Sequence, residues 1–168
     1  HEVHDLNNGL EYLEFEAGKT GEKSNINKIR ESQIKWIPQT SPWLWLYNKM
    51  QSAFISANNK FKFDLIFLKE LIQYTEYYGS VQGHYDWHLD LGNESLSTRK
   101  LSMTVLLSDP NTFEGGDLEF HMGDGIKKAP REQYSCTIFP SFILHRVTPV
   151  TKGTRKSLVL WVGGSTFK

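Results

Sequence analysis

The sequence predicts a mainly β domain, a sandwich or barrel preceded by a small helical layer. Two observations support this fold class, and a third indicates a single domain. After residue 60, short segments rich in β-branched and aromatic residues alternate with turns that contain Gly, Pro and Asp. A single segment with helical spacing of apolar residues comes before them. The sequence has no internal repeat, low-complexity tract or linker, so residues 1–168 are expected to form one domain.

The first third of the chain is expected to contain two strands and one helix. Residues 9–15 and 29–38 have the alternation of strands, and the polar residues 18–27 between them are typical of an exposed loop. The helix is expected to begin at Ser41, an N-cap residue followed by a proline. Its core-facing residues are expected to be Trp43, Leu44, Tyr47, Met50, Phe54 and Ile55.

The rest of the chain has the pattern of consecutive short strands. Strands are expected at residues 61–67, 71–78, 78–90, 100–108, 115–120, 134–139 and 155–162. Breaks between them are expected at a polar loop (92–99), at turns (109–112 and 123–125) and at a hairpin turn (151–154).

The composition excludes some classes of partner. Nineteen basic residues balance nineteen acidic ones, so neither nucleic acid nor an acidic membrane is expected to bind. No apolar run approaches the ~20 residues that a membrane span requires, and the first residues do not have the pattern of a signal peptide. Cys136 is the single cysteine, which precludes an intrachain disulfide and suits a reducing cytoplasm.

A histidine and a carboxylate end the stretch from residue 78 to residue 90. If this stretch is a strand, His88 and Asp90 point to the same face because side chains alternate with period two. They would then form half of a facial triad, in which two histidines and one carboxylate bind Fe(II). The pair His84 and Asp86 has the same spacing, so spacing does not choose between them, and most isolated pairs of this kind bind no metal.

His145 is the candidate for the third metal ligand. It lies in the apolar segment 139–150, where a buried structural histidine is the alternative, whereas His121 follows a strand and is expected to be exposed. The next strand contains Arg155 among apolar neighbours. Arginine is rarely buried without a partner and its planar fork matches a carboxylate, so this strand predicts an anion site beside the metal.

These residues together resemble a known family. The pattern consists of Tyr78, Gly83, Tyr85, His88-Leu-Asp90, Gly115-Gly116, His145 and Arg155. It is similar to that of the Fe(II)/2-oxoglutarate-dependent oxygenases, specifically the prolyl 4-hydroxylase-like family of the bacterial and viral type. The resemblance spans about residues 25–164, with a core motif region of about 61–164, and it is most specific from residue 76 onward.

The resemblance implies a fold and a set of site residues. The fold would be a double-stranded β-helix, or jelly roll, with helices packed on one side. The metal ligands, and thus the catalytic residues, would be His88, Asp90 and His145. The cofactor-binding residues would be Arg155, on the distal carboxylate of 2-oxoglutarate, and Tyr78, which would donate a hydrogen bond near it.

Further positions follow from the same resemblance. His84 and Asp86 would lie toward the mouth of the site, where they contact substrate or form a solvated rim. Leu106 occupies a position where some relatives have a second tyrosine for the cosubstrate, which leaves the set of hydrogen bonds incomplete. Thr148 and Trp161 would lie near the pocket, with packing as the expected role of Trp161.

The implied function is hydroxylation of a C–H bond, with release of succinate and CO2. Fe(II), 2-oxoglutarate and O2 would be required, with ascorbate as a candidate reductant. The expected substrate is a prolyl residue in a peptide or protein, reached through a groove closed by the loops at 18–27 and 92–99. The alternatives are the same chemistry on a free amino acid or other small molecule, or a non-catalytic jelly-roll binding module. The sequence gives no oligomeric state.

Overall fold

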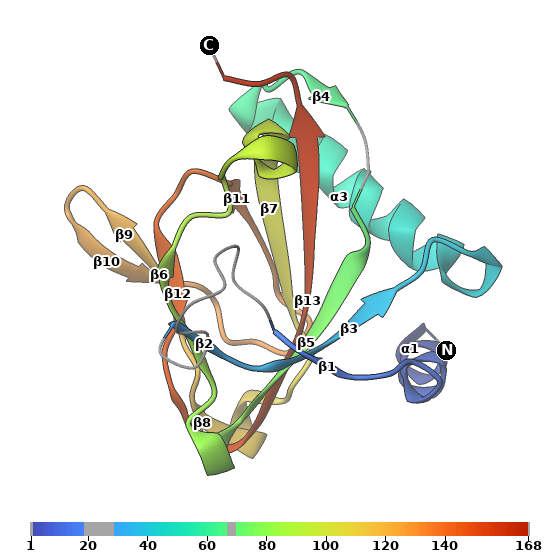
Figure 1. Cartoon of the computed structure of the whole chain (residues 1–168), viewed down its shortest axis with the longest axis vertical. Helices are drawn as coiled ribbons and strands as arrows, with labels where there is room; N and C mark the ends of the chain where they lie inside the picture. Colours follow the sequence, from blue (N-terminus) through green and yellow to red (C-terminus); the bar gives the residue numbers. More distant parts are fainter. Residues whose placement is uncertain (1, 19–28, 67–69, 168) are drawn as a thin grey trace.

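The structure is a computed structural model that describes residues 2–18, 29–66 and 70–167. Two antiparallel sheets face each other, and helix α3 (Leu44–Phe61) lies along the outside of the larger sheet (Figure 1). The mainly β class and the jelly-roll arrangement with helices on one side are confirmed. Most of the loop expected at residues 18–27 lies outside the described residues.

The larger sheet has eight strands. In spatial order, six of them are β1 (Glu16–Ala17), β3 (Gln33–Ile37), β5 (Ile72–Tyr78), β13 (Val150–Gly164), β7 (Arg99–Leu106) and β11 (Cys136–Pro140). The other two, β4 (Leu65–Ile66) and β8 (Phe113–Gly115), pair with β13. The five strands of the smaller sheet are, in order, β10 (Gly125–Lys128), β9 (Leu118–Met122), β12 (His145–Val147), β6 (His84–His88) and β2 (Arg30–Glu31).

The remaining elements are one helix at the start of the chain and four short 3-10 turns. They are α1 (Glu2–Glu11) and the 3-10 turns η1 (Ser41–Trp43), η2 (Gly79–Val81), η3 (Glu94–Thr98) and η4 (Pro110–Thr112). Among the described residues, no helix combines the length and the apolar character that crossing a bilayer requires.

Alternation along the central strands gives the larger sheet two different faces. On β13, Leu158 and Leu160 belong to the apolar core that includes the helices. The residues between and beyond them, Val159 and Trp161, line a pocket on the other side of the sheet. Period-two geometry therefore separates a structural face from a functional face within one strand.

The helical layer is joined to the sheet by apolar packing and by one buried hydroxyl. Leu46, Met50 and Phe54 of α3 are buried against the outer face of the sheet. The hydroxyl of Tyr47, also on α3, donates to the carbonyl of Ile37 at 2.6 Å and accepts from the amide of Ile72 at 3.0 Å. One side chain therefore connects the helix to both β3 and β5.

Two expectations about elements are wrong. Residues 9–15 do not form a strand, because Leu6 and Leu10 are four residues apart on α1 and bury the same helical face, while Tyr12 is 88% exposed. Residues 151–154 do not form a hairpin turn, because β13 continues through them. Gly153 has a φ of +70°, and a Cβ there would lie 2.0 Å from the carbonyl oxygen of Thr112. Glycine therefore lets β13 pass close to the 3-10 turn η4.

Two other expectations hold with changed boundaries. The strand at residues 29–38 is divided into β2 and β3, which belong to different sheets. The helix begins as the 3-10 turn η1, in which the residue in the N-cap position is Thr40 rather than Ser41. It then continues to Phe61, which is further than the apolar pattern indicated.

Replacement of Tyr47 by Phe tests the connection between helix and sheet. The change leaves the Ile37 carbonyl and the Ile72 amide without their partner while it preserves the ring, so the free energy of unfolding should fall by about 2 kcal/mol. Urea denaturation measures this loss. Tyr12→Phe, at an exposed position, is the matched control and should leave the midpoint unchanged.

Candidate metal centre and adjoining pocket

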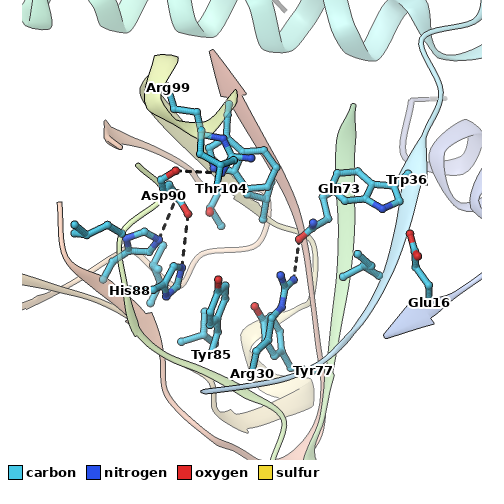
Figure 2. Close-up of a pocket in the computed structure, with 18 residues that line it drawn as sticks. Glu16, Arg30, Trp36, Gln73, Tyr77, Tyr85, His88, Asp90, Arg99 and Thr104 are labelled. Carbon is cyan, nitrogen blue, oxygen red and sulfur yellow. Dashed lines mark hydrogen bonds and ion pairs between the residues drawn. The ribbon is translucent and has the colours of Figure 1, made fainter. Parts of the chain in front are cut away.

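Three residues that are distant in sequence meet at one end of the two paired strands β6 and β12. His88 ends β6, Asp90 follows two residues later, and His145 begins β12 directly opposite His88. One ligand atom from each lies within 4.8 Å of the other two. The Asp90 carboxylate is 3.7 Å from Nε2 of His88 and 3.5 Å from Nε2 of His145 (Figure 2). The structure thus brings together the three residues expected as metal ligands.

A β-bulge resolves the ambiguity between the two His-x-Asp pairs. His145 is opposite His88, but Val147 is opposite Tyr85, so β6 has one residue more than β12 over this interval. Tyr85 and His88 therefore face the same side, and their rings stack with centroids 3.4 Å apart. His84 and Asp86 line a separate groove of about 360 Å³ and not the mouth of the pocket that contains His88.

Both histidines are oriented so that Nε2 is the nitrogen available to a metal. Nδ1 of His88 is 2.7 Å from the carbonyl oxygen of Asp86, and Nδ1 of His145 is 2.8 Å from that of Ile143. A carbonyl only accepts, so each Nδ1 carries a proton and each Nε2 is the nitrogen left to bind a metal at the centre of the cluster. Burial, together with the neighbouring His145, lowers the pKa of His88 to about 4, so this ring is neutral near pH 7.

Asp90 is buried and held by hydroxyl groups. Its Oδ2 accepts from the Ser102 hydroxyl at 2.6 Å, and the Ser102 and Ser141 hydroxyls are 3.0 Å apart. Burial by itself raises the pKa of Asp90, but the adjacent His145 and His88 and the hydrogen bond from Ser102 outweigh it, so the net shift is downward. The carboxylate is therefore charged and can bind a cation.

The cluster fits a first-row divalent metal. Two neutral imidazole nitrogens and one carboxylate on the same side of a point are the donor set of non-haem Fe(II) sites, which keep the opposite positions open. In the part of the chain that the structure describes, no other group of three or more His, Cys, Asp or Glu residues gathers in this way. His121, expected to be exposed, is exposed.

A pocket of about 300 Å³ opens beside the cluster, between the two sheets. Figure 2 shows Arg30 and Gln73 on the side of this pocket opposite His88 and Asp90, with an Arg30 Nη2 to Gln73 Oε1 distance of 2.8 Å. Its other lining residues are Glu16, Ile34, Trp36, Tyr77, Tyr85, Leu89, Leu96, Arg99, Thr104, Leu118, His145, Val147, Val159 and Trp161. Leu96 comes from η3, within the loop expected at 92–99.

Arg155 lies in a smaller cavity next to this pocket. The two share Thr104 and Leu118 as lining residues, so they adjoin. The guanidinium is 3% exposed and donates to the Ser157 hydroxyl at 3.0 Å, but no described carboxylate lies within 4.0 Å of it. Burial lowers its pKa. A buried cation without an acidic partner is a strong candidate for binding an anion.

Glycine at position 116 gives Arg155 its space. Gly116 has a φ of +64°, and a Cβ there would lie 2.9 Å from Cδ of Arg155. The Gly115-Gly116 pair singled out in the sequence therefore serves the geometry of this cavity, because a larger residue would crowd the arginine side chain and adopt a strained backbone conformation.

The structure does not bring Tyr78 into the pocket. Tyr77 is opposite Arg155 in the pairing of β5 with β13, whereas Tyr78 is opposite Thr154 and faces the other side. The Tyr78 hydroxyl donates to Glu76, and burial together with this carboxylate raises the pKa of Tyr78 to about 12. Tyr77 lines the pocket, with its ring centroid 5.6 Å from the guanidinium carbon of Arg155. Two adjacent strand residues cannot share a face, and the pairing with Arg155, which only the structure gives, identifies Tyr77.

Two other positions differ in how they relate to the pocket. Trp161 lines it, as expected. Thr148 lines the separate groove of His84, where its hydroxyl accepts from the amide of Asp117 at 2.8 Å. Leu106 lines the cavity of Arg155 and offers no hydroxyl group. The lining residues that have one are Thr104, Ser135 and Thr137.

A jelly roll with a His-Asp-His cluster between its sheets and a buried arginine beside it is the arrangement expected of a non-haem metal protein with an anion subsite. The family model described as the 2OG-Fe(II) oxygenase superfamily matches residues 72–163, which is more than half of the chain. The chain belongs to this superfamily. Fe(II), 2-oxoglutarate and O2 are the cofactor and cosubstrates that this family uses, and the donor set fits the iron.

Similar proteins include hydroxylases of bacteria. A PKHD-type hydroxylase of Colwellia psychrerythraea is 29% identical over 156 residues, which cover 91% of this chain and 69% of that protein. A PKHD-type hydroxylase of Teredinibacter turnerae is 34% identical over 85 residues, which cover 48% of this chain and 38% of that protein. The matched part of the chain thus spans less than half the length of several curated relatives.

A solved structure supports the fold. A prolyl hydroxylase from Trichoplax adhaerens, in complex with a peptide fragment of the hypoxia inducible factor oxygen degradation domain, superimposes with a TM-score of 0.76 at 21% identity. The match covers 95% of this chain and 74% of that one. At this identity the likeness shows the shared jelly roll.

Alanine substitutions test which His-x-Asp pair binds metal. His88→Ala and His145→Ala each remove a ligand nitrogen and should weaken Zn(II) binding by more than about 100-fold. Replacement of a residue that contacts a metal ligand, but not the metal, usually has a smaller effect. His84→Ala removes a histidine from the separate groove and should leave the affinity unchanged. Isothermal titration calorimetry on metal-free protein measures all three, and a large loss in His84→Ala would contradict the assignment.

Proposed function

We propose that this chain is an Fe(II)- and 2-oxoglutarate-dependent dioxygenase that hydroxylates a C–H bond of a prolyl residue in a peptide or protein. One observation carries the proposal. The buried guanidinium of Arg155 has no acidic partner among the described residues, and its cavity adjoins the pocket of the His-Asp-His cluster. A metal cluster beside a cation that lacks a counter-ion fits a cosubstrate with one chelating end and one carboxylate end.

The proposed reaction uses one molecule of each reactant. O2 supplies one oxygen atom to the substrate as a hydroxyl and one to the new carboxylate of succinate, while 2-oxoglutarate loses CO2. Fe(II), when bound by His88, Asp90 and His145, supplies the redox chemistry that activates O2. The protein contributes two imidazole nitrogens, a charged carboxylate and a pocket beside them.

Arg155 and its neighbours would hold the cosubstrate. The guanidinium would bind the distal carboxylate of 2-oxoglutarate through charge-assisted hydrogen bonds, and the carboxylate would neutralise a cation that is otherwise buried without a counter-ion. We assign the tyrosine contact to Tyr77 in place of Tyr78, since Tyr77 lies on the side of Arg155. Thr104, which lines both cavities, lies between the two ends of the proposed ligand.

The substrate would enter over an apolar rim. Trp36 and Leu89 line the pocket and are 37% and 47% exposed, so they offer apolar surface against which a pyrrolidine ring can pack. The names of the similar proteins, PKHD-type hydroxylase and prolyl hydroxylase, support this substrate class. A reducing cytoplasm would suit both Fe(II) and the free, exposed thiol of Cys136, and we include that location in the proposal.

A specific observation favours a second candidate, which is the same chemistry on a free amino acid. Glu16 and Arg30 line the pocket together. Opposite charges in one pocket suit a zwitterion, whose carboxylate and ammonium groups a residue within a peptide chain does not have.

Arg155→Gln tests the cosubstrate subsite. The variant should bind 2-oxoglutarate about 10- to 100-fold more weakly, the loss expected for one charge-assisted contact. Its affinity for 2-oxobutyrate, which has no distal carboxylate, should equal that of the wild type. Anaerobic titration of the Fe(II)-loaded protein, followed by the visible metal-to-ligand charge-transfer band, measures both. Arg146→Gln, on the smaller sheet, is the matched control. Absence of the band in iron-loaded wild type would refute the dependence on 2-oxoglutarate.

A substrate panel tests the prolyl assignment. Proline-containing peptides should increase succinate formation above the level seen with 2-oxoglutarate alone, and mass spectrometry should show one added oxygen atom on a prolyl residue. Trp36→Ala should raise the KM for the peptide and leave the affinity for 2-oxoglutarate unchanged, since Trp36 is at the rim. Stimulation by free proline but by no peptide would favour the second candidate. Bound 2-oxoglutarate without any turnover would support the non-catalytic binding module.

A further inference from the structure

The indole nitrogen of Trp161 is buried without a hydrogen-bond partner. Trp161 is 7% exposed and lines the pocket beside the metal cluster. Among the side-chain nitrogen and oxygen atoms of the described residues that water does not reach, its Nε1 is the one without a partner. Buried donors are almost always satisfied in folded proteins, so this exception needs an explanation.

The strand register places this indole beside Asp90. Trp161 on β13 is directly opposite Ser102 on β7, and directly opposed residues of an antiparallel pair share one face. Ser102 uses that position to donate to Oδ2 of Asp90. The other oxygen, Oδ1, is 3.7 Å from Nε2 of His88. The indole N–H without a partner and the Asp90 carboxylate therefore lie at the same end of the pocket.

A third residue fixes the indole plane. The guanidinium carbon of Arg99 is 3.8 Å from the ring of Trp161, and Nη1 of Arg99 donates to the backbone oxygen of Asp90 at 3.2 Å. Two further nitrogens of Arg99 donate to the carboxylate of Glu70. Arg99 therefore contacts both Trp161 and Asp90 while its ion pair with Glu70 holds it in place. The position of Trp161 relative to Asp90 is fixed as a result.

We propose that Trp161 is a positioning residue for the metal ligand Asp90. In the metal-loaded site its indole N–H donates to the carboxylate oxygen that does not bind the metal. This inference rests on the proposed metal site. Ser102 and Trp161 are neighbours across the sheet, and each donates a hydrogen bond to the carboxylate. The carboxylate therefore cannot rotate to bind the metal through both of its oxygens. The positions opposite the three protein ligands then stay open.

Metal affinity provides the first test. Trp161→Phe removes the N–H and should weaken Zn(II) binding by about 10-fold. This is the smaller of the losses usually seen when a residue that hydrogen-bonds to a metal ligand is replaced. Trp36→Phe makes the same change at the rim of the same pocket and should leave the affinity unchanged. Ser102→Ala should weaken binding as well, and the double variant Ser102→Ala/Trp161→Phe should depart from additivity because both donors act on one carboxylate.

The wild-type protein provides a second test that does not depend on the folding of a variant. The chain has five tryptophans, so ¹⁵N-labelled protein gives a small set of indole N–H signals. Variants at Trp36, Trp43, Trp45 and Trp87 assign four of them and identify that of Trp161 by difference. Addition of Zn(II) should shift the Trp161 indole proton downfield, as formation of a hydrogen bond does, and a packing role alone would leave this signal in place.

A third variant separates the N–H group from the ring. Replacement of Trp161 by benzothienylalanine keeps the bicyclic ring against Arg99 and exchanges N–H for sulfur. This protein should bind Zn(II) as weakly as Trp161→Phe does. Zn(II) binding with wild-type affinity in this variant, together with an unmoved indole signal in the wild type, would overturn the role of Trp161. A wild type that binds no Zn(II) would instead refute the proposed metal site.

Discussion

The pairing of β6 with β12, with one extra residue in β6, is the constraint on which the site depends. It places His88 directly opposite His145 and lets Asp90 turn back toward both. The bulge also puts Tyr85 on the side of His88, where the two rings stack. A regular strand would have aligned both His-x-Asp pairs on one face. Because of the bulge, His88 and Asp90 line the pocket, whereas His84 and Asp86 line the separate groove.

The larger sheet allows the space between the sheets to be polar. Its outer face is covered by α3 and α1, and this apolar layer supplies much of the burial that stabilises the domain. Its inner face carries hydroxyl, amide and guanidinium groups next to the pocket, among them those of Gln73, Ser102 and Arg155. The division is possible because a strand directs alternate residues to opposite faces, so one strand serves both the core and the site.

The inner face carries an energetic cost that ligands would relieve. Arg155 is buried without an acidic partner among the described residues, and the indole N–H of Trp161 has no acceptor there. Each of these groups destabilises the protein by itself, because water no longer solvates it. A bound anion would neutralise the charge of Arg155, and a rearranged Asp90 would accept a hydrogen bond from the indole N–H of Trp161. Binding of the cosubstrate and of the metal would thus provide partners for the groups that the protein leaves unsatisfied, as is expected of a preorganised site.

The sequence by itself determined the β-rich class, the helix after residue 41, and the identity of His88, Asp90, His145 and Arg155 as the residues to examine. Residue types and spacing carry this information because ligand chemistry and period-two alternation are local. Only the tertiary structure decided which His-x-Asp pair enters the pocket and which of two adjacent tyrosines faces Arg155. A bulge and a cross-strand register each depend on the partner strand, and a one-residue shift reverses the face of every side chain.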